Sequence, residues 1–155
     1  MPRGPAWFHT TVGIRRGNLS DERECLMATV ELTGENFESV IGGADLALVD
    51  FWAAWCGPCR MFGPVFEQAS EANPDAVFGK VDTEAQQGLA ASFGISSIPT
   101  LMIIRDGVVL YAQPGALPAP ALAELITKAR EIDMDQVRAT IAAQESRQEG
   151  AQTAS

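Results

Sequence analysis

The sequence predicts an α/β fold built around a mixed β-sheet. Short apolar segments that suit strands alternate with segments of helical periodicity as far as about residue 104, which favours parallel strands joined by crossover helices. The dipeptide Asp106-Gly107 then separates two further strand-like segments, and Asp-Gly in such a place is a strong hairpin signal. The last two strands are therefore expected to be antiparallel.

The first half of the chain supplies two strands and two helices. Residues 30–32 alternate apolar and polar side chains, as a short edge strand does. Residues 37–41 repeat apolar side chains at helical spacing until glycines end the pattern. The apolar stretch 46–52 predicts a buried strand. A proline at position 58 suits the first turn of a helix, which we expect to run to about residue 71.

The second half supplies three more strands and two more helices. After a turn at residues 73–75 we expect a strand at 77–81, a helix over about 84–93, strands at 100–104 and 108–112, and a helix over about 119–131. Prolines precede the strand at 100 and the helix at 119. Proline lacks a backbone N–H, and it is tolerated at both places because an N–H there would have no regular hydrogen-bond partner.

The chain divides into three parts. Residues 1–27 show no persistent helical or strand period, so we expect a disordered N-terminal extension. Residues 28–131 form the folded domain. Residues 132–155 are expected to form a short helical extension, with Asp133 and Gln136 as a capping box. A polar tail that frays beyond about residue 145 should follow.

The composition excludes several classes of protein. The chain has 155 residues and a net charge of -9, whereas a nucleic-acid-binding surface needs a basic stripe. It shows neither an apolar run of the about 20 residues that a membrane helix needs nor a signal-peptide core. Its 3 cysteines are too few for a disulfide-rich secreted framework. We therefore expect a cytoplasmic protein that binds neither nucleic acid nor membrane, and we expect it to be a monomer.

Cys56 and Cys59 form the most informative motif, because they follow a predicted strand and begin a predicted helix. A spacing of three residues places the two sulfurs within reach of one another. The unpaired N–H groups and the dipole of the helix start stabilise a thiolate at Cys56. Gly57 keeps the approach to this sulfur open, and Pro58 stiffens the loop. This arrangement suits a reversible dithiol/disulfide pair.

Two other interpretations of the cysteines stay open at this point. The pair could be half of a zinc site, or it could be two buried structural thiols. Zinc needs about four ligands, and the remaining candidates, Cys25 and His9, both lie in the N-terminal extension. We therefore favour redox chemistry and expect no metal.

Asp50 is the second candidate for a chemical role. Because side chains alternate along a strand, Leu46, Leu48 and Asp50 point to the same face. An aspartate on an apolar face is expected to be buried, and burial raises the pKa of a carboxyl group. The alternative is an aspartate at a strand end that faces solvent.

Four separated motifs resemble those of the thioredoxin family. The segment from Val49 to Met61 contains Trp-Cys-Gly-Pro-Cys, and Lys80-Val81-Asp82, Ile98-Pro99-Thr100 and Gly115-Ala116-Leu117 follow in the family's order. The resemblance covers about residues 28–130. It implies the thioredoxin fold, in which a central mixed five-stranded sheet is flanked by four helices.

The resemblance also implies roles for individual residues. Cys56 would be the nucleophile and Cys59 the resolving cysteine. Asp50 would act as general acid/base toward Cys59, and Lys80 would pair with this carboxylate.

A further set of residues would bind substrate. The resemblance implies a cis peptide bond between Ile98 and Pro99, which lies beside the cysteines. Ile98 would offer backbone groups to an extended segment of a protein substrate. Trp55, Gly115 and Ala116 would complete an apolar landing surface.

The implied function is that of a protein-disulfide reductase. The redox-active disulfide Cys56–Cys59 would replace any bound cofactor, and a thioredoxin reductase would recycle it with its own NADPH and flavin. Disulfide-containing proteins would be the substrates. Two alternatives remain, a thioredoxin-like binding or chaperone module and a specialised disulfide oxidase or isomerase.

Overall fold

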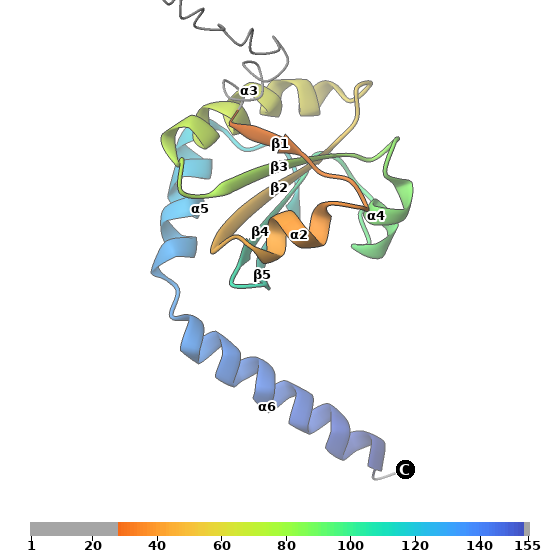
Figure 1. The fold of residues 1–155 in the computed structure, drawn as a ribbon, viewed down its shortest axis with the longest axis vertical. Coiled ribbons are helices and arrows are strands. Elements are labelled where there is room, and N and C mark those ends of the chain that lie inside the picture. The colour runs from red at the N-terminus through yellow and green to blue at the C-terminus, as the bar shows by residue number, and fades with distance from the viewer. Residues whose placement is uncertain (1–27, 154–155) are drawn as a thin grey trace, which may run out of the picture.

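The computed structural model describes residues 28–153, so the prediction for residues 1–27, including Cys25 and His9, lies outside the described residues. A five-stranded sheet forms the centre, with strand order β1-β3-β2-β4-β5 (Figure 1). Its strands are β1 (Thr29–Glu31), β2 (Leu46–Trp52), β3 (Val77–Asp82), β4 (Thr100–Arg105) and β5 (Val108–Pro114). Strands β1 and β2 pair with β3 in parallel, while β4 is antiparallel to β2 and β5 to β4. The mixed sheet is confirmed.

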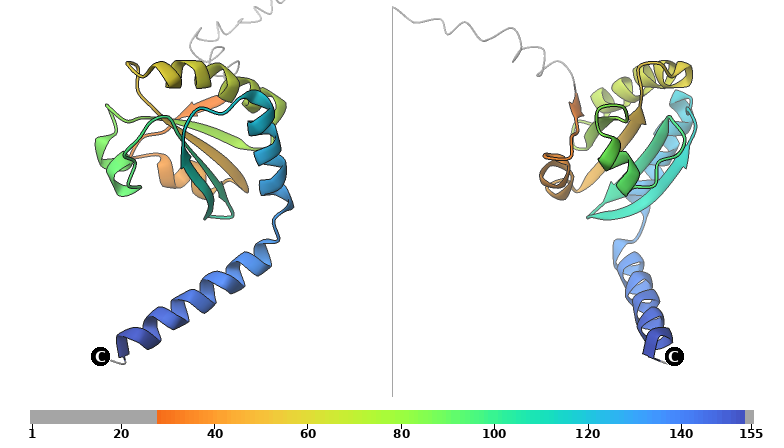
Figure 2. Two further views of the ribbon diagram at one scale, coloured as in Figure 1. Left: turned by 180° about the vertical axis from the view of Figure 1, so that it is seen from behind. Right: turned by 90° about the vertical axis from the view of Figure 1, so that its right-hand side faces the viewer.

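Two helices cover each face of the sheet (Figure 2). On one face, α3 (Gly57–Ala72) and α5 (Ala119–Glu131) enclose a core with the sheet. On the other face, the short helices α2 (Phe37–Gly42) and α4 (Gln87–Ser92) pack over a second core. The predicted arrangement of four flanking helices is therefore confirmed.

The central strand β2 contributes to both cores. Leu46 and Leu48 point into the core beneath α3 and α5, whereas Ala47, Val49 and Phe51 point into the core beneath α2 and α4. Alternation along the strand puts the side chain of residue 50 on the same face as Leu46 and Leu48. This face is the one that α3 covers, and the first turn of α3 carries the two cysteines.

One helix begins later than predicted. Asp82 Oδ1 accepts hydrogen bonds from the backbone N–H groups of Glu84 at 2.9 Å and Ala85 at 3.4 Å. This side-chain turn competes with a helical start, so α4 begins only at Gln87.

The C-terminal extension is longer than predicted, because α6 (Met134–Thr153) continues through the residues that were expected to fray. Alanine, glutamine, glutamate and arginine dominate residues 142–149, and all four have high helix propensity. Asp133 Oδ1 accepts hydrogen bonds from the N–H groups of Asp135 and Gln136, which confirms the predicted cap. Beyond an ion pair of 3.1 Å between Arg138 and Asp106, α6 extends away from the sheet (Figure 1).

Candidate active site

The two cysteines lie at the first turn of α3 and are joined by a disulfide, with their Cα atoms 5.2 Å apart. Cys56 is the N-cap of the helix, and its Sγ accepts a hydrogen bond of 3.2 Å from the backbone N–H of Cys59. Pro58 occupies the first turn, where its missing N–H has no helical partner to lose. A negative charge on Cys56 Sγ would therefore meet a backbone donor and the positive end of the helix.

The surroundings of the disulfide are largely apolar. Each cysteine is only 4% exposed, and Ala53, Trp52 and Ile98 pack against the pair. The carbonyl oxygen of Ile98 lies 3.8 Å from Cys56 Sγ, so the predicted neighbourhood of Ile98 and the cysteines is confirmed. Low exposure of this kind limits access to partners that fit the surface around Cys56.

Asp50 is buried beneath this turn, as the alternating pattern of β2 predicts. Its exposed fraction is 0%, and neither carboxylate oxygen has a hydrogen-bond partner. Burial raises the pKa of Asp50 from its ordinary value of 3.8 to about 7, and the positive charge of Lys80 offsets part of this increase. Asp50 can therefore both hold and release a proton near neutral pH, as a general acid/base must.

Lys80 lies next to Asp50 in the sheet, since the two are paired in the parallel register of β2 and β3. Its ammonium lies 5.1 Å from the centre of the Trp52 ring, a cation–π contact. The ion pairs within residues 28–153 do not include Lys80. The structure thus brings Lys80 beside Asp50 but directs its ammonium over Trp52.

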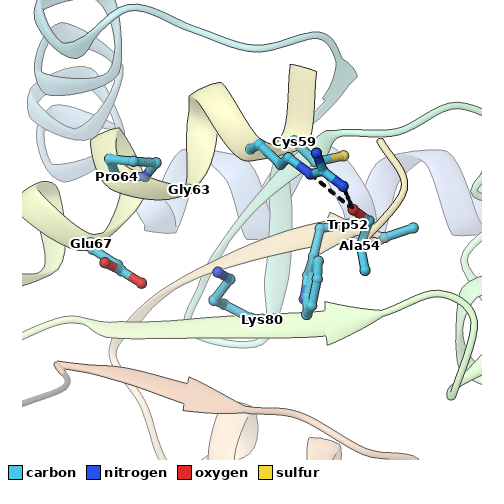
Figure 3. A pocket seen from close by; sticks show the side chains of 9 residues that line it. Trp52, Ala54, Cys59, Gly63, Pro64, Glu67 and Lys80 are labelled. Atoms are coloured by element: carbon cyan, nitrogen blue, oxygen red, sulfur yellow. Dashed lines mark hydrogen bonds between the residues drawn. The ribbon is translucent and has the colours of Figure 1, made fainter. Parts of the chain in front are cut away.

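A hollow of about 390 Å³ opens beside Cys59 (Figure 3). Lys80 from β3 and Glu67 from α3 face the same space. Arg60 also lines it, and its guanidinium donates hydrogen bonds of 3.0 and 2.8 Å to the carbonyl oxygen of Ala54. The Cys59 side of the cysteine pair therefore adjoins an open space that is lined in part by charged side chains.

The rim around Cys56 contains the predicted substrate residues. Trp55 is 67% exposed, and its Nε1 donates a hydrogen bond of 2.6 Å to Glu84 Oε1. The peptide bond between Ile98 and Pro99 is cis, as the family resemblance implied. Gly115 N–H donates a hydrogen bond of 2.8 Å to the carbonyl oxygen of Pro99, which places Gly115 and the exposed Ala116 near this bond.

Sequence reasoning missed Glu67 and Glu84. Glu67 follows Cys59 by eight residues on one helix, so helical periodicity alone could have placed both on one face. No local pattern marks Glu84, because its contact with Trp55 spans 29 residues and exists only in the folded chain.

The sequence profile of the thioredoxin family, described simply as "Thioredoxin", matches residues 28–128. The chain belongs to the thioredoxin family. A Streptomyces coelicolor protein named "Putative thioredoxin 2" is 60% identical over 121 residues, which cover 78% of this chain and 90% of that protein. Thioredoxin from Bacillus subtilis is 40% identical over 103 residues, covering 66% of this chain and 98% of that protein.

Solved thioredoxin structures agree with this assignment. A mutant thioredoxin from Halobacterium salinarum superimposes with a TM-score of 0.63 at 34% identity, covering 68% of this chain and 93% of that one. Membership of this family means that the Cys56–Cys59 pair is redox-active and that the chain is a thiol-disulfide oxidoreductase. The family works through this disulfide rather than through a bound cofactor.

The same family membership implies a thioredoxin reductase and disulfide substrates as partners in general. None of the helices within residues 28–153 combines the length and apolar character needed to cross a bilayer. Over the same residues, no cluster of His, Cys, Asp and Glu side chains could hold a metal ion.

Proposed function

We propose that this thioredoxin is a general protein-disulfide reductase in which Cys56 is the nucleophile and Cys59 the resolving cysteine. The observation that carries the proposal is the position of the pair at the start of α3, above a buried carboxyl group whose pKa is about 7. A nucleophilic thiolate and a nearby proton acceptor are the two requirements of such a reaction.

In the first step the Cys56 thiolate attacks one sulfur of a substrate disulfide. A mixed disulfide forms, and the other substrate sulfur leaves as a thiolate that takes up a proton. Only the thiolate is nucleophilic, and the N–H of Cys59 and the helix start support it. Gly57 and Pro58 are both exposed, so the approach to Cys56 from this side is open.

In the second step Asp50 takes the proton of the Cys59 thiol, and the Cys59 thiolate attacks Cys56 Sγ. The Cys56–Cys59 disulfide forms, and the substrate leaves as a second thiolate that is protonated in turn. Two electrons pass from the cysteine pair to the substrate disulfide. Lys80, which lies beside Asp50 in register, would adjust how readily the carboxyl group accepts the proton.

Protein substrates would bind at the rim of Trp55, Ile98, Pro99, Gly115 and Ala116. The exposed indole of Trp55 offers apolar area, and Ile98 would offer its backbone to an extended peptide. Such pairing through the backbone suits a reductase that accepts many different proteins.

Recycling would depend on a thioredoxin reductase that brings its own NADPH and flavin. This thioredoxin would act as a monomer in the cytoplasm. The small number of cysteines supports that location.

Insulin reduction coupled to NADPH and a thioredoxin reductase tests the proposal. The unaltered protein should turn over, Cys56→Ser should lose all activity, and Cys59→Ser should accumulate a mixed disulfide with substrate that mass spectrometry detects. Turnover that survives Cys56→Ser would overturn the assignment of the nucleophile. A reduction potential well above roughly -200 mV would instead indicate an oxidase or isomerase.

A further inference from the structure

Three residues form a strip along α3 beside the cysteine pair. Cys59, Gly63 and Glu67 are spaced by four residues, so they lie on one face of the helix, and all three line the hollow (Figure 3). A Cβ atom at Gly63 would lie 4.0 Å from Lys80 Nζ. The ammonium of Lys80 thus lies directly beneath the middle of the strip, with Cys59 one turn to one side and Glu67 one turn to the other.

The charges that face Lys80 come from three other elements. Asp50 lies beside it on β2 and Glu31 lies beside it on β1, and α3 contributes Arg60 and Glu67. The guanidinium of Arg60 is occupied by the carbonyl oxygen of Ala54. Among the residues that line the hollow, Glu67 is the one acidic residue, while Asp50 and Glu31 are the acidic neighbours of Lys80 within the sheet.

We propose that Glu67 is a positioning residue of the exchange reaction: it draws the Lys80 ammonium away from Asp50 and so sets the pH at which Asp50 accepts the proton of Cys59. The inference rests on the proposed function, in which Asp50 serves Cys59. It adds to that function a role for an exposed side chain of α3 that touches neither cysteine.

The proton balance of the step is simple. The Cys59 thiol loses a proton to the Asp50 carboxylate, and the resulting thiolate displaces substrate sulfur from Cys56. Asp50 later gives up the proton to solvent. A Lys80 ammonium held closer to Asp50 stabilises the carboxylate and delays its protonation to lower pH.

Glu67→Gln tests the inference, because it removes the negative charge and keeps the shape of an exposed side chain. The pKa of Asp50, followed by carboxyl-carbon NMR in the oxidised protein, should fall by roughly 0.5 pH unit, as expected for the loss of one partly screened charge. The rising limb of the pH profile of insulin reduction should move down by the same amount. Glu71→Gln, one turn farther along α3 and outside the hollow, is the matched control and should move neither.

A double substitution separates an effect through Lys80 from direct repulsion. In a Lys80→Met background, adding Glu67→Gln should change the pKa of Asp50 by less than about 0.2 pH unit. An unchanged shift in that background, an equal shift in Glu71→Gln, or no shift in Glu67→Gln alone would each overturn the inference. Failure of the unaltered protein to reduce insulin would count against the proposed function, while the Asp50 titration could still be measured.

Discussion

Replacing the buried acid of β2 should make the protein more stable, and the gain should depend on pH. Asp50 is 0% exposed without a hydrogen-bond partner, so its ionised form is unfavourable in the folded protein. Its pKa is about 7 in the folded protein and 3.8 ordinarily. Between these values the unfolded chain has lost a proton that the folded protein keeps, so rising pH favours unfolding.

The magnitude follows from that interval. It spans about three pH units, since 7 minus 3.8 is close to three, and each unit is worth about 1.4 kcal/mol. The folded state should therefore lose about 4 kcal/mol from this group between pH 4 and pH 8. Asn at this position does not titrate, so the stability advantage of Asp50→Asn over the parent should grow by about 4 kcal/mol over the same range.

Urea denaturation of the oxidised protein at pH 4, 5, 6, 7 and 8 measures this difference directly. Asp45→Asn is the control, because Asp45 lies exposed just before the same strand and stays hydrated in both states. A stability difference between Asp50→Asn and the parent that stays constant from pH 4 to pH 8 would refute the reasoning. It would mean that Asp50 ionises as readily in the folded protein as in the unfolded chain.

Three further substitutions test other parts of the structure. Arg105→Met removes a guanidinium whose Nη1 lies 3.1, 3.0 and 2.7 Å from three carbonyl oxygens at the end of α5. Urea denaturation should show that the free energy of unfolding falls by about 2 kcal/mol. An unchanged free energy of unfolding would mean that water replaces the guanidinium at these carbonyl groups. Gly79→Ala drives a Cβ atom into Leu32, so calorimetry should show a Tm lower by roughly 5 °C, whereas an unchanged Tm would show that Leu32 repacks freely. Glu84→Ala removes the hydrogen-bond acceptor of the Trp55 indole and should raise KM for insulin about threefold with little change in kcat. An unchanged KM would mean that Trp55 does not contribute to substrate binding.

Much of the fold could be predicted because local pattern and tertiary environment agree. The stretch 46–52 is apolar almost throughout, and β2 is indeed the central strand with both faces covered. The Asp106-Gly107 signal coincides with the turn between β4 and β5, where both residues adopt positive φ. The cis bond before Pro99 could be expected only from the family resemblance, since local sequence strongly favours trans.

What escaped prediction depends on contacts between distant segments or on competition between weak local preferences. The hydrogen bond of Glu84 to Trp55 needs the whole sheet to bring them together. The late start of α4 reflects a side-chain turn made by Asp82, which a helical pattern does not reveal. Polarity alone indicated a frayed end for the chain, but the high helix propensity of residues 142–149 extends α6 instead.

Asp50 is the position at which the rules for a stable core and the needs of the proposed reaction conflict. Its neighbours Leu46 and Leu48 on the same face of β2 are apolar, and an apolar residue at position 50 would avoid the cost of about 4 kcal/mol at pH 8. The same burial that causes this cost brings the pKa of the carboxyl group to about 7, where proton transfer to and from a thiol is most efficient. Local inconsistency of this kind concentrates at functional sites. The single charged residue in an otherwise apolar strand therefore marks the proposed acid/base group in the amino-acid sequence itself.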